Sequence, residues 1–394
     1  MKTFNTKPVT LVVAAALGLL TSSASIAATP SEIAQPAPKT TQAIDANIIN
    51  FSFAIAQDHQ LDLNTQAVTT VSDEYYFTVS GRQLNKGIDI HTSQKGALIK
   101  ISRQNDLGKA LENEAMQLRS ASQPKKNLAI NIIGENDLKT TGIFTASTAI
   151  KLTDEVKPGK LTLSYERPLA AKNLYVIHVK EKGTANKLEI STAKQQYRQG
   201  ESFSFDAAML ANNDTLALDN VTAFIMSPSG KKFNASIRLT DSGIAQISAS
   251  KQALEATAIE APINGLYELH VNAMTNAGGQ QIHRTGKIAF ALSPDTADLN
   301  KLSLIFVNKN KATASIGLTV KTAGRFEVRG TLYGHDAQGN LQPLMETHSA
   351  QNFSAGKQAI NIQFNQQILA KSTLKAPYVL KNVRLFDQTR MSRL

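Results

Sequence analysis

Hydrophobic and polar residues alternate along most of the chain in short runs of roughly five to eight residues. Typical runs lie at 75–79, 161–165 and 174–179; they are rich in β-branched and aromatic residues and are bounded by Gly, Pro, Asn or Asp. Alternation with a period of two places every second side chain on one face of an extended strand. Because no long helical segments alternate with these runs, the pattern disfavours a parallel α/β fold and predicts an all-β protein built from sandwiches.

One segment departs from this period. In residues 106–119, Leu107, Leu111, Ala115 and Leu118 recur at near-helical intervals. We therefore expect at most one short helix in the N-terminal domain, and we expect it in this segment.

Residues 188–292 carry the clearest succession of strands and turns. Seven strand-like runs are separated by turn signals such as Ser-Pro-Ser-Gly at 227–230, Thr-Asp-Ser-Gly at 240–243 and Asn-Ala-Gly-Gly at 276–279. In the first of these, Pro suits the second position of a tight turn and Gly suits the last. Seven strands in about a hundred residues are typical of a constant-type immunoglobulin sandwich.

Tyr267 lies at the start of the sixth of these runs, where immunoglobulin-like domains place a tyrosine whose hydroxyl bonds back to the backbone. In antibody domains a buried Cys follows two residues later, and a buried Trp lies on the third strand. We expect Leu269 and Phe224 to take those two buried positions, so that apolar packing replaces the disulfide. The alternative for Tyr267 is an amphipathic tyrosine at a sheet edge.

The strand-like pattern resumes after residue 295, with a hairpin tip expected at 334–340. We therefore predict three β-sandwich domains in series. The predicted boundaries are 47–187 for an N-terminal β-domain, 188–294 for the immunoglobulin-like sandwich and 295–394 for a basic C-terminal sandwich.

Several motifs resemble those of a family of secreted γ-proteobacterial proteins that is catalogued as a domain of unknown function. The C-terminal signature is carried by GRFEVRGTLYG at 324–334, APYV at 376–379 and LFDQTRM at 385–391. The middle and N-terminal parts of the family are matched by GLYEL at 265–269, RTGK at 284–287 and KPGKLTL at 157–163. The resemblance implies an exported β-sandwich protein without an assigned activity, so it brings no functional residues to this chain.

The first residues have the composition of a secretory signal peptide. Lys2 and Lys7 precede an apolar stretch at 9–20, which is followed by small residues up to Ala28. Cleavage after Ala27 would leave 1–27 as the signal peptide, and the protein would be periplasmic or secreted. The alternative is an N-terminal membrane anchor, for which the apolar stretch is short, since a membrane span needs about 20 residues.

Residues 28–46 carry Pro30, Pro36 and Pro38 among Gln, Thr and Ala. Such a segment buries too little apolar surface to fold, so we expect a disordered linker. No later run is apolar enough to span a bilayer, so no transmembrane segment is expected in the mature chain.

The chain of 394 residues contains no cysteine. This excludes disulfides, thiolate zinc sites, iron–sulfur clusters and cysteine nucleophiles. With 42% hydrophobic and 19% charged residues the composition is that of a globular protein, so the sandwiches must be stabilised by apolar packing alone.

Motifs for nucleophilic catalysis or nucleotide binding are missing. The chain has no G-x-S-x-G elbow, no G-x-G-x-x-G and no Walker-type phosphate loop. The S-x-x-K pattern occurs at Ser122, Ser248 and Ser354, but none is followed by the partner motifs of penicillin-recognising enzymes. Carboxylate pairs for glycoside hydrolysis are recognised by geometry, and spacing selects none. We therefore nominate no catalytic residue.

Metal-ligand spacing is also missing. The seven histidines form neither H-x-x-x-H nor H-E-x-x-H; they are His59, His91, His178, His270, His283, His335 and His348. His270 and His283 lie on consecutive strands and could meet on one face of a hairpin, although two imidazoles without a third ligand are more often a solvated pair. Residues 62–66 begin like a calcium loop but lack its Gly and Glu, and calcium near Asp295 and Asp298 stays open. We nominate no metal ligand and no cofactor.

The net charge is +11, from 42 Lys and Arg against 31 Asp and Glu. Residues 295–394 contribute most of it, with 13 basic and 6 acidic side chains. This excess suggests an anionic partner such as lipopolysaccharide, phospholipid headgroups, acidic polysaccharide or an acidic protein; export disfavours nucleic acid. The alternative is a solvated surface whose lysines protect sheet edges. The basic residues singled out are Lys309, Lys311, Lys321, Arg325, Arg329, Lys371, Lys375, Lys381, Arg384, Arg390 and Arg393.

Three functions follow as hypotheses. The first is an exported, non-catalytic interaction or adhesion-type protein that binds an envelope or extracellular partner, expected to be anionic. The second is a hydrolase acting on envelope polymers through carboxylates of the N-terminal domain. The third is a chaperone-like or ancillary factor in which an edge strand accepts a strand of its partner.

Overall fold

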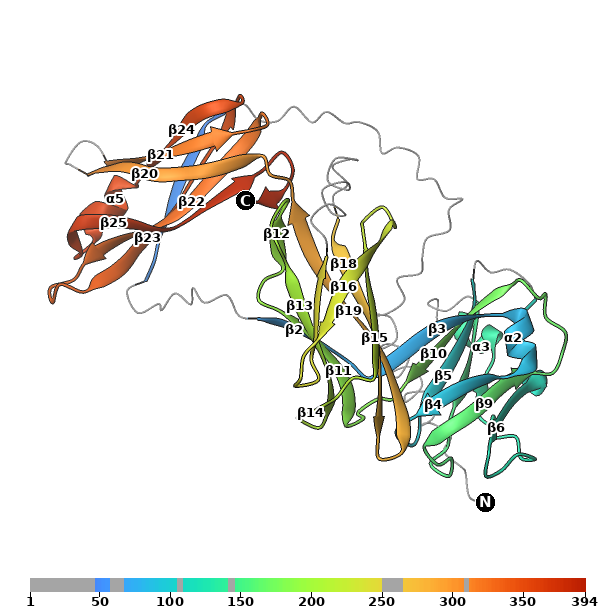
Figure 1. The fold of residues 1–394 in the computed structure, drawn as a ribbon. Helices are drawn as coiled ribbons and strands as arrows, with labels where there is room; N and C mark the ends of the chain where they lie inside the picture. Colours follow the sequence, from blue (N-terminus) through green and yellow to red (C-terminus); the bar gives the residue numbers. More distant parts are fainter. Residues whose placement is uncertain (1–46, 57–66, 105–108, 141–145, 250–264, 308–311) are drawn as a thin grey trace, which may run out of the picture.

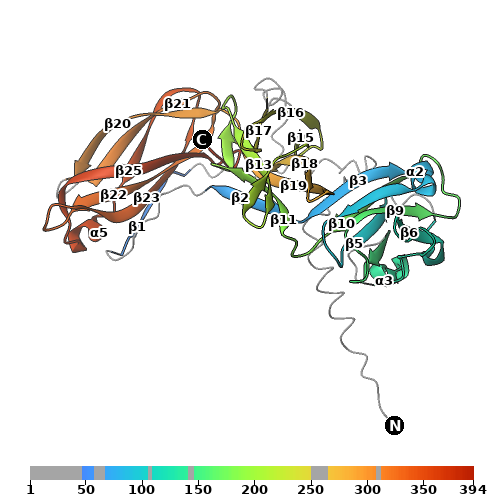
Figure 2. The same ribbon diagram turned by 60° about the horizontal axis from the view of Figure 1, so that its bottom comes forward.

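The computed structural model describes residues 47–56, 67–104, 109–140, 146–249, 265–307 and 312–394. They form three β-sandwich lobes that follow one another in a row, with the middle lobe between the other two (Figure 1; Figure 2 shows the row from another side). Each lobe has its own apolar core. The all-β class predicted from the alternation is thus confirmed.

The N-terminal lobe packs a five-stranded sheet on a three-stranded sheet. Side chains such as Tyr75, Ile99 and Ile177 alternate along their strands and fill the space between the sheets. The first sheet runs in the order β3 (Glu74–Ser80), β10 (Leu174–Lys180), β5 (Leu98–Arg103), β8 (Ser147–Lys151) and β7 (Ile132–Ile133). The second runs in the order β4 (Ile88–Thr92), β9 (Gly159–Tyr165) and β6 (Met116–Ser120).

The helix expected over 106–119 was wrong. The described part of this segment contains the 3-10 turn η2 (Asn113–Ala115) and then strand β6. Pairing with β9 decides the outcome, because Met116 and Leu118 both enter the core at a spacing of two. The same residues therefore satisfied a helical period only by coincidence.

Two short α-helices of this lobe lie elsewhere. The first, α2 (Gly81–Lys86), begins at a capping box in which Ser80 and Gln83 bond reciprocally. The second, α3 (Glu135–Lys139), places Leu138 against Leu98 on the outer face of the five-stranded sheet. Both stand at the ends of strands and leave the sandwich architecture unchanged.

The middle lobe contains all seven strands expected from the sequence. Its sheet is continuous, because β16 (Lys232–Leu239) pairs with β15 through its first residues and with β17 through its last. The other strands are β2 (Val68–Ser72), β11 (Asn186–Thr192), β12 (Gln196–Arg198), β13 (Ser204–Ala211), β14 (Asp214–Leu216), β15 (Asn220–Met226), β17 (Ala245–Ala249), β18 (Tyr267–Ala277) and β19 (Gln280–Ser293).

The predicted turns of the middle lobe also form. The amide of Gly230 donates to the carbonyl of Ser227 at 2.9 Å, and the amide of Gly243 donates to that of Thr240 at 3.0 Å. Gly278 and Gly279 link β18 to β19 with φ values of 57° and 76°. Two consecutive positive φ values are those of a tight hairpin turn, which explains why both residues are glycine.

The positions predicted around Tyr267 are correct only in part. Leu269 is fully buried, as expected, but Ile225 takes the core position that was assigned to Phe224. Phe224 lies on the opposite face and stacks on His270, with ring centres 4.7 Å apart. The Tyr267 ring packs on Phe290 at 5.7 Å, and its hydroxyl makes no hydrogen bond within the described part of the chain. Register causes the error, since a shift of one residue exchanges the two faces of a strand.

The C-terminal lobe again packs five strands on three. The larger sheet runs in the order β1 (Ile49–Ala54), β23 (Leu341–Phe353), β22 (Gly324–His335), β25 (Lys375–Asp387) and β26 (Ser392–Arg393). The smaller sheet runs in the order β20 (Ala297–Val307), β21 (Ala312–Val320) and β24 (Gly356–Gln363). A short helix, α5 (Gln366–Lys371), precedes β25.

The first described residues do not belong to the N-terminal lobe, in contrast to the predicted boundary at 47. Strand β1 pairs with β23 of the C-terminal lobe, where Figure 1 shows it in blue among orange and red strands. Strand β2 pairs with β11 of the middle lobe. The chain therefore contributes first a strand to the C-terminal lobe and then a strand to the middle lobe, and the sheets of the N-terminal lobe begin only at Glu74. Predicted segments 1–27 and 28–46 lie outside the described residues.

Candidate interaction site

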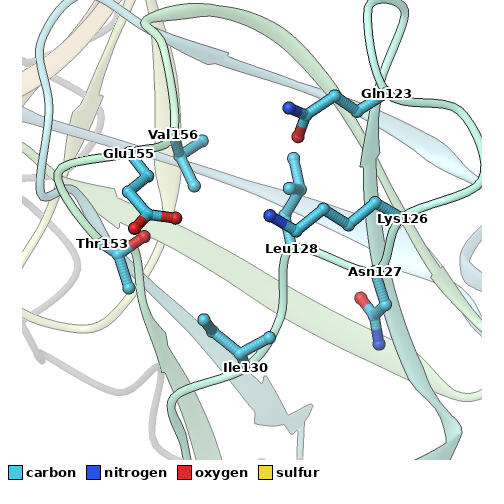
Figure 3. Close-up of a pocket in the computed structure, with 8 residues that line it drawn as sticks. All are labelled: Gln123, Lys126, Asn127, Leu128, Ile130, Thr153, Glu155 and Val156. Atoms are coloured by element: carbon cyan, nitrogen blue, oxygen red, sulfur yellow. The ribbon is translucent and has the colours of Figure 1, made fainter.

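A pocket in the N-terminal lobe is too small to be an active site. Its volume of about 50 Å³ accommodates a few water molecules, whereas ligand pockets of proteins enclose about 300–1,000 Å³. Figure 3 shows that its walls come from two loops. The lining residues are Gln123, Lys126, Asn127, Leu128, Ile130, Thr153, Glu155 and Val156.

The three S-x-x-K patterns have no helical setting. Ser122 is exposed in a turn after β6, Ser248 is exposed on β17, and Ser354 is exposed between β23 and β24. An S-x-x-K nucleophile needs its lysine one helical turn away, inside a cavity. These serines therefore do not form such a site.

His270 and His283, which could have met on one hairpin face, lie apart. Within the β18–β19 ladder His270 is opposite Lys287, and His283 is opposite Met274. His283 instead stacks on His91 of the N-terminal lobe, with ring centres 4.9 Å apart. Within the described residues no three His, Asp or Glu side chains are grouped as a metal site.

The first junction, between the N-terminal and middle lobes, brings titratable side chains together. The hydroxyl of Tyr76 on β3 lies 3.2 Å from Nδ1 of His270 on β18. Nε2 of the same imidazole lies 3.0 Å from a carboxylate oxygen of Glu268, which also accepts from Lys287 at 2.8 Å. The hydroxyl, the imidazole and the carboxylate thus contact one another in the same order as a nucleophile, its base and the group that orients the base. Burial and the charges of Glu268 and Glu74 raise the pKa of Tyr76, however, so the phenol is not activated.

A second row of charges continues along β3 and β10. Glu74 contacts Nε2 of His178 at 3.2 Å and Nζ of Lys180 at 2.9 Å. Burial alone would raise the pKa of Glu74, but the bonds and charges of these two partners prevail and lower it to about 2. Burial lowers the pKa of the neighbouring Lys100 to about 8. The row is a charge network on a sheet face in which Glu74 is compensated by His178 and Lys180.

At the centre of the first junction lies a fully buried ion pair. Nη2 of Arg284 on β19 is 2.5 Å from Oε2 of Glu181, and the two side chains are 1% and 0% exposed. The carboxylate also accepts from the hydroxyl and amide of Ser93 at 2.7 and 2.6 Å. Nε of Arg284 donates to the carbonyl of Asn186 at 2.9 Å. These bonds fasten the N-terminal lobe to the middle lobe.

The second junction, between the middle and C-terminal lobes, holds the two aspartates considered for calcium. Asp295 and Asp298 both accept from Nη2 of Arg198, at 2.5 and 2.9 Å. Lys321 contacts the same two carboxylates at 2.6 and 2.8 Å. The positions that a cation would take between these carboxylates are thus occupied by side chains of the chain itself. The calcium-like segment at 62–66 lies outside the described residues.

Several basic side chains of the C-terminal lobe are bonded within the chain itself. Arg329 pairs with Glu327, Arg384 with Glu346, and Arg390 with Asp387. Arg325 is buried and donates to the carbonyl of Asn47, and Lys321 is held at the second junction. These bonds engage individual basic side chains, but they leave the excess of 13 basic over 6 acidic side chains in the lobe unchanged. Lys309 and Lys311 lie outside the described residues; Lys371, Lys375 and Arg393 are exposed, and Lys381 lies over the ring of Tyr333.

Aromatic and charged side chains gather on the outer face of the large C-terminal sheet, which we call the C-terminal face. Phe51 and Phe53 of β1 point outward and are 41% and 58% exposed. Phe51 stacks on His348 of the neighbouring strand, with ring centres 4.4 Å apart. Farther across the sheet, Arg329 and Arg384 are directly opposite each other. We define the C-terminal face as Ile49, Phe51, Phe53, Glu327, Arg329, Glu346, His348, Arg384 and Phe386.

Arg329 shows how this face is organised. Its guanidinium carbon lies 4.4 Å from the ring centre of Phe386, and its Nε donates to Glu327 at 2.8 Å. Glu327 also contacts Nδ1 of His348 at 2.8 Å. Burial alone would raise the pKa of Glu327, but the bonds with Arg329 and His348 outweigh burial and lower it. Half-exposed arginines beside exposed aromatic rings are common at the energetic centres of protein interfaces.

The C-terminal face is not recognisable in the sequence because its parts are distant in the chain. Phe51, Phe53 and Ile55 alternate with Ser52 and Ala54, a pattern that predicts a strand but does not reveal the sheet that receives it. A signal was present in the residue types, since Asn50 and Ser52 occupy the inward positions while Phe51 and Phe53 face outward. An edge strand whose apolar side faces solvent is unusual for a folded monomer.

Comparison with known proteins defines first the class and then the family. The fold is that of a three-lobed β-sandwich protein; a DUF4785 family protein from Legionella pneumophila, known from a crystal structure, shares it with a TM-score of 0.66 at 19% identity, over 89% of this chain and 91% of that one. The N-terminal domain of the family described as a domain of unknown function (DUF4785) matches residues 40–181, and its C-terminal domain matches residues 296–394. This chain belongs to the DUF4785 family.

Other similarities are weaker. Escherichia coli alpha-2-macroglobulin aligns over 82% of this chain and 20% of its own length, at 10% identity and a TM-score of 0.29. No curated protein matches the chain. The resemblance inferred from the sequence motifs is confirmed, and it leaves the activity of the chain to be argued from its own surface.

Proposed function

We propose that this chain is an exported, non-catalytic interaction protein that binds an anionic component of the cell envelope through the C-terminal face. The observation that carries the proposal is that one sheet face presents the exposed rings of Phe51 and Phe53 and, on the strands beyond that of His348, Arg329 and Arg384. Aromatic rings supply apolar contact area, and arginines supply directed bonds to phosphate or carboxylate groups. Export is supported by the signal-like pattern of residues 1–27. None of the described helices is long and apolar enough to cross a bilayer.

Binding to immobilised anionic ligands tests the proposal. Lipopolysaccharide, phosphatidylglycerol vesicles and an acidic polysaccharide form separate arms, each measured at low and at physiological salt. We expect binding in at least one arm, weakened as salt shortens the Debye length from about 30 Å at 0.01 M to about 8 Å at 0.15 M. Absence of binding in every arm, or binding without salt dependence, would contradict the proposal.

A matched pair of variants locates the surface. Arg329→Gln with Arg384→Gln removes two charges from the C-terminal face, and we expect binding to weaken about tenfold. Arg119→Gln with Arg167→Gln is the control, because these two half-exposed arginines are also paired with carboxylates, those of Glu166 and Glu112, but lie on the N-terminal lobe. Equal effects of both changes would assign binding to overall charge and not to this face.

Export is tested separately by the mass of the protein recovered from the producing cell. We expect a chain that begins at Ala28, found in the periplasm or the medium. A cytoplasmic chain that retains residues 1–27 would contradict this part of the proposal and leave the binding surface untouched.

A further inference from the structure

Strand β1 offers an unpaired edge. It pairs with β23 from Ile49 to Ala54 without a register shift, and no other strand among the described residues pairs with its second edge. The amide of Ile55 donates to the carbonyl of Leu344 at 3.0 Å, which fixes the phase of the ladder. In an antiparallel pair, hydrogen-bonding positions alternate along the strand. The backbone groups of Ile49, Phe51 and Phe53 therefore point to β23, and those of the residues between them point away.

This edge lacks the features that protect exposed strands. Natural edges carry lysine, proline or a bulge that prevents pairing with another chain. The sequence INFSFA of β1 has no charge and no proline, and its ladder has no bulge. The opposite edge of the same sheet, β26, carries Arg393, and the edge strand β24 of the facing sheet carries Lys357. A neutral six-residue strand of high β-propensity is the kind of segment that pairs with other strands.

We propose that β1 pairs antiparallel with β1 of a second copy of this chain, with the two-fold axis at Ser52. The backbone groups that point to the free edge are those of Asn50, Ser52 and Ala54. An axis at Ser52 places Ser52 opposite itself and Asn50 opposite Ala54, which is the register that uses all of them. No charge on β1 opposes the approach of an identical strand.

The same register also pairs the aromatic side chains. Phe51 of each copy lies opposite Phe53 of the other, at positions where the two backbones do not exchange hydrogen bonds and the side chains come closest. Cross-strand aromatic pairs are among the most favourable in sheets. Rings that are exposed in one copy would thereby be partly covered by the second copy.

The dimer would also enlarge the C-terminal face. Two-fold pairing in this register keeps the outer faces of both sheets on the same side, so two five-stranded sheets become one continuous sheet. Two adjacent copies of the face can bind one extended surface with higher avidity than a single copy. The pairing itself does not depend on what the face binds.

A single cysteine tests the register. Because the chain contains no cysteine, Ser52→Cys introduces the only thiol. Opposed residues in hydrogen-bonding positions have Cα atoms about 5.5 Å apart, which lies within the roughly 4.4–6.8 Å that disulfides bridge. We expect mild oxidation to convert the full chain into a disulfide-linked dimer that thiol reductant separates. Ser122→Cys on the N-terminal lobe is the control and should remain monomeric; equal crosslinking of the two variants would overturn the proposal.

Two proline variants separate the free edge from the paired edge. The amide of Ala54 points away from β23, so Ala54→Pro should leave the thermal midpoint unchanged while weakening dimerisation about tenfold or more, because each copy loses one donor. The amide of Phe53 points to β23, so Phe53→Pro should lower the thermal midpoint of the C-terminal lobe. Sedimentation over a range of concentrations gives the association constant. A wild-type chain that sediments as a monomer throughout, or an Ala54→Pro chain that dimerises like wild type, would overturn the proposal.

Discussion

The two junctions between lobes are built from the same kinds of side chain but in opposite environments. At the first junction Arg284 and Glu181 are completely buried; Ser93 donates hydrogen bonds to Glu181, and the carbonyl of Asn186 accepts one from Arg284. At the second junction the four charged side chains, those of Arg198, Asp295, Asp298 and Lys321, are between 31% and 41% exposed. The second junction has four ion pairs against one at the first, and the two junctions differ above all in how far water reaches their charges.

Solvent access decides how strongly each junction depends on its charges. Exposed ion pairs are screened by water and contribute about 0–1 kcal/mol each. Buried ion pairs are costly to assemble, but the removal of one partner leaves an uncompensated charge in a medium of low polarity. The first junction should therefore be rigid and intolerant of substitution, and the second should be adjustable. The N-terminal and middle lobes would then move as one unit relative to the C-terminal lobe.

The largest effect is expected from Arg284→Met. The change leaves the Glu181 carboxylate buried without its partner, and loss of about 3–5 kcal/mol in the free energy of unfolding is expected for such a site. Urea unfolding followed separately for each lobe measures it. Arg198→Met at the second junction is the matched control and should cost about 1 kcal/mol or less.

A double variant shows whether the cost comes from the unpaired charge. Replacing both partners, with Arg284→Met and Glu181→Leu, removes the charge together with its need for compensation. We expect this variant to recover much of the stability that Arg284→Met loses. If Arg284→Met and Arg198→Met lowered the free energy of unfolding equally, the contrast between the junctions would be refuted.

Features of the fold that neighbouring residues determine could be predicted from the sequence, whereas features that depend on the pairing of distant strands could not. The strands and turns of the middle lobe were predictable because alternation and the glycines at 278 and 279 act within a few residues. The helix expected near Leu111 failed because the spacing of apolar residues suited two periods, and pairing with β9 chose between them. The assignment of Phe224 to the core failed by one residue of register.

The sites were harder to foresee than the strands, because each is assembled from distant segments. Arg284 and Glu181 are about a hundred residues apart, and neither neighbourhood carries a motif that points to the other. The alternation of β1 indicates a strand, but its pairing with Thr347 and His348 joins segments that are about three hundred residues apart in the sequence. No property of residues 49–54 alone specifies that destination.

Acid should have an intermediate effect on stability, and it should distinguish the two junctions, because a group at the first junction titrates between pH 6.5 and 4. Burial, the charge of His91 and the charge of Arg284 lower the pKa of His283 from 6.5 to about 4. Between these pH values the unfolded chain binds a proton at His283 and the folded chain does not. The contribution of this group to the free energy of unfolding is therefore fully present above pH 6.5 and is lost as the pH falls towards 4. The loss should be on the order of 2–3 kcal/mol at the first junction.

The groups facing His283 define the control for this prediction. Tyr75 and His91 lie against its ring, and burial also lowers the pKa of His91. His283→Gln should flatten the dependence of unfolding free energy on pH between 6.5 and 4. Glu74, with its pKa lowered to about 2, adds a further loss only below pH 4.5. An unchanged slope in the glutamine variant would show that other groups carry the acid sensitivity.

The smallest effect is expected at the second junction from Asp298→Asn. The bond from Lys321 lowers the pKa of Asp298, against a smaller opposing contribution from burial, so this carboxylate stays ionised until the pH falls below its usual 3.8. Its stabilisation is therefore present throughout the range in which His283 titrates. Because the side chain is 40% exposed, we expect a cost of about 1 kcal/mol or less, and less still at high salt. Domain-resolved unfolding at low and high salt measures it. A salt-independent loss as large as that of Arg284→Met would mean that the second junction is as dry as the first, and the two would then hold their lobes by the same mechanism.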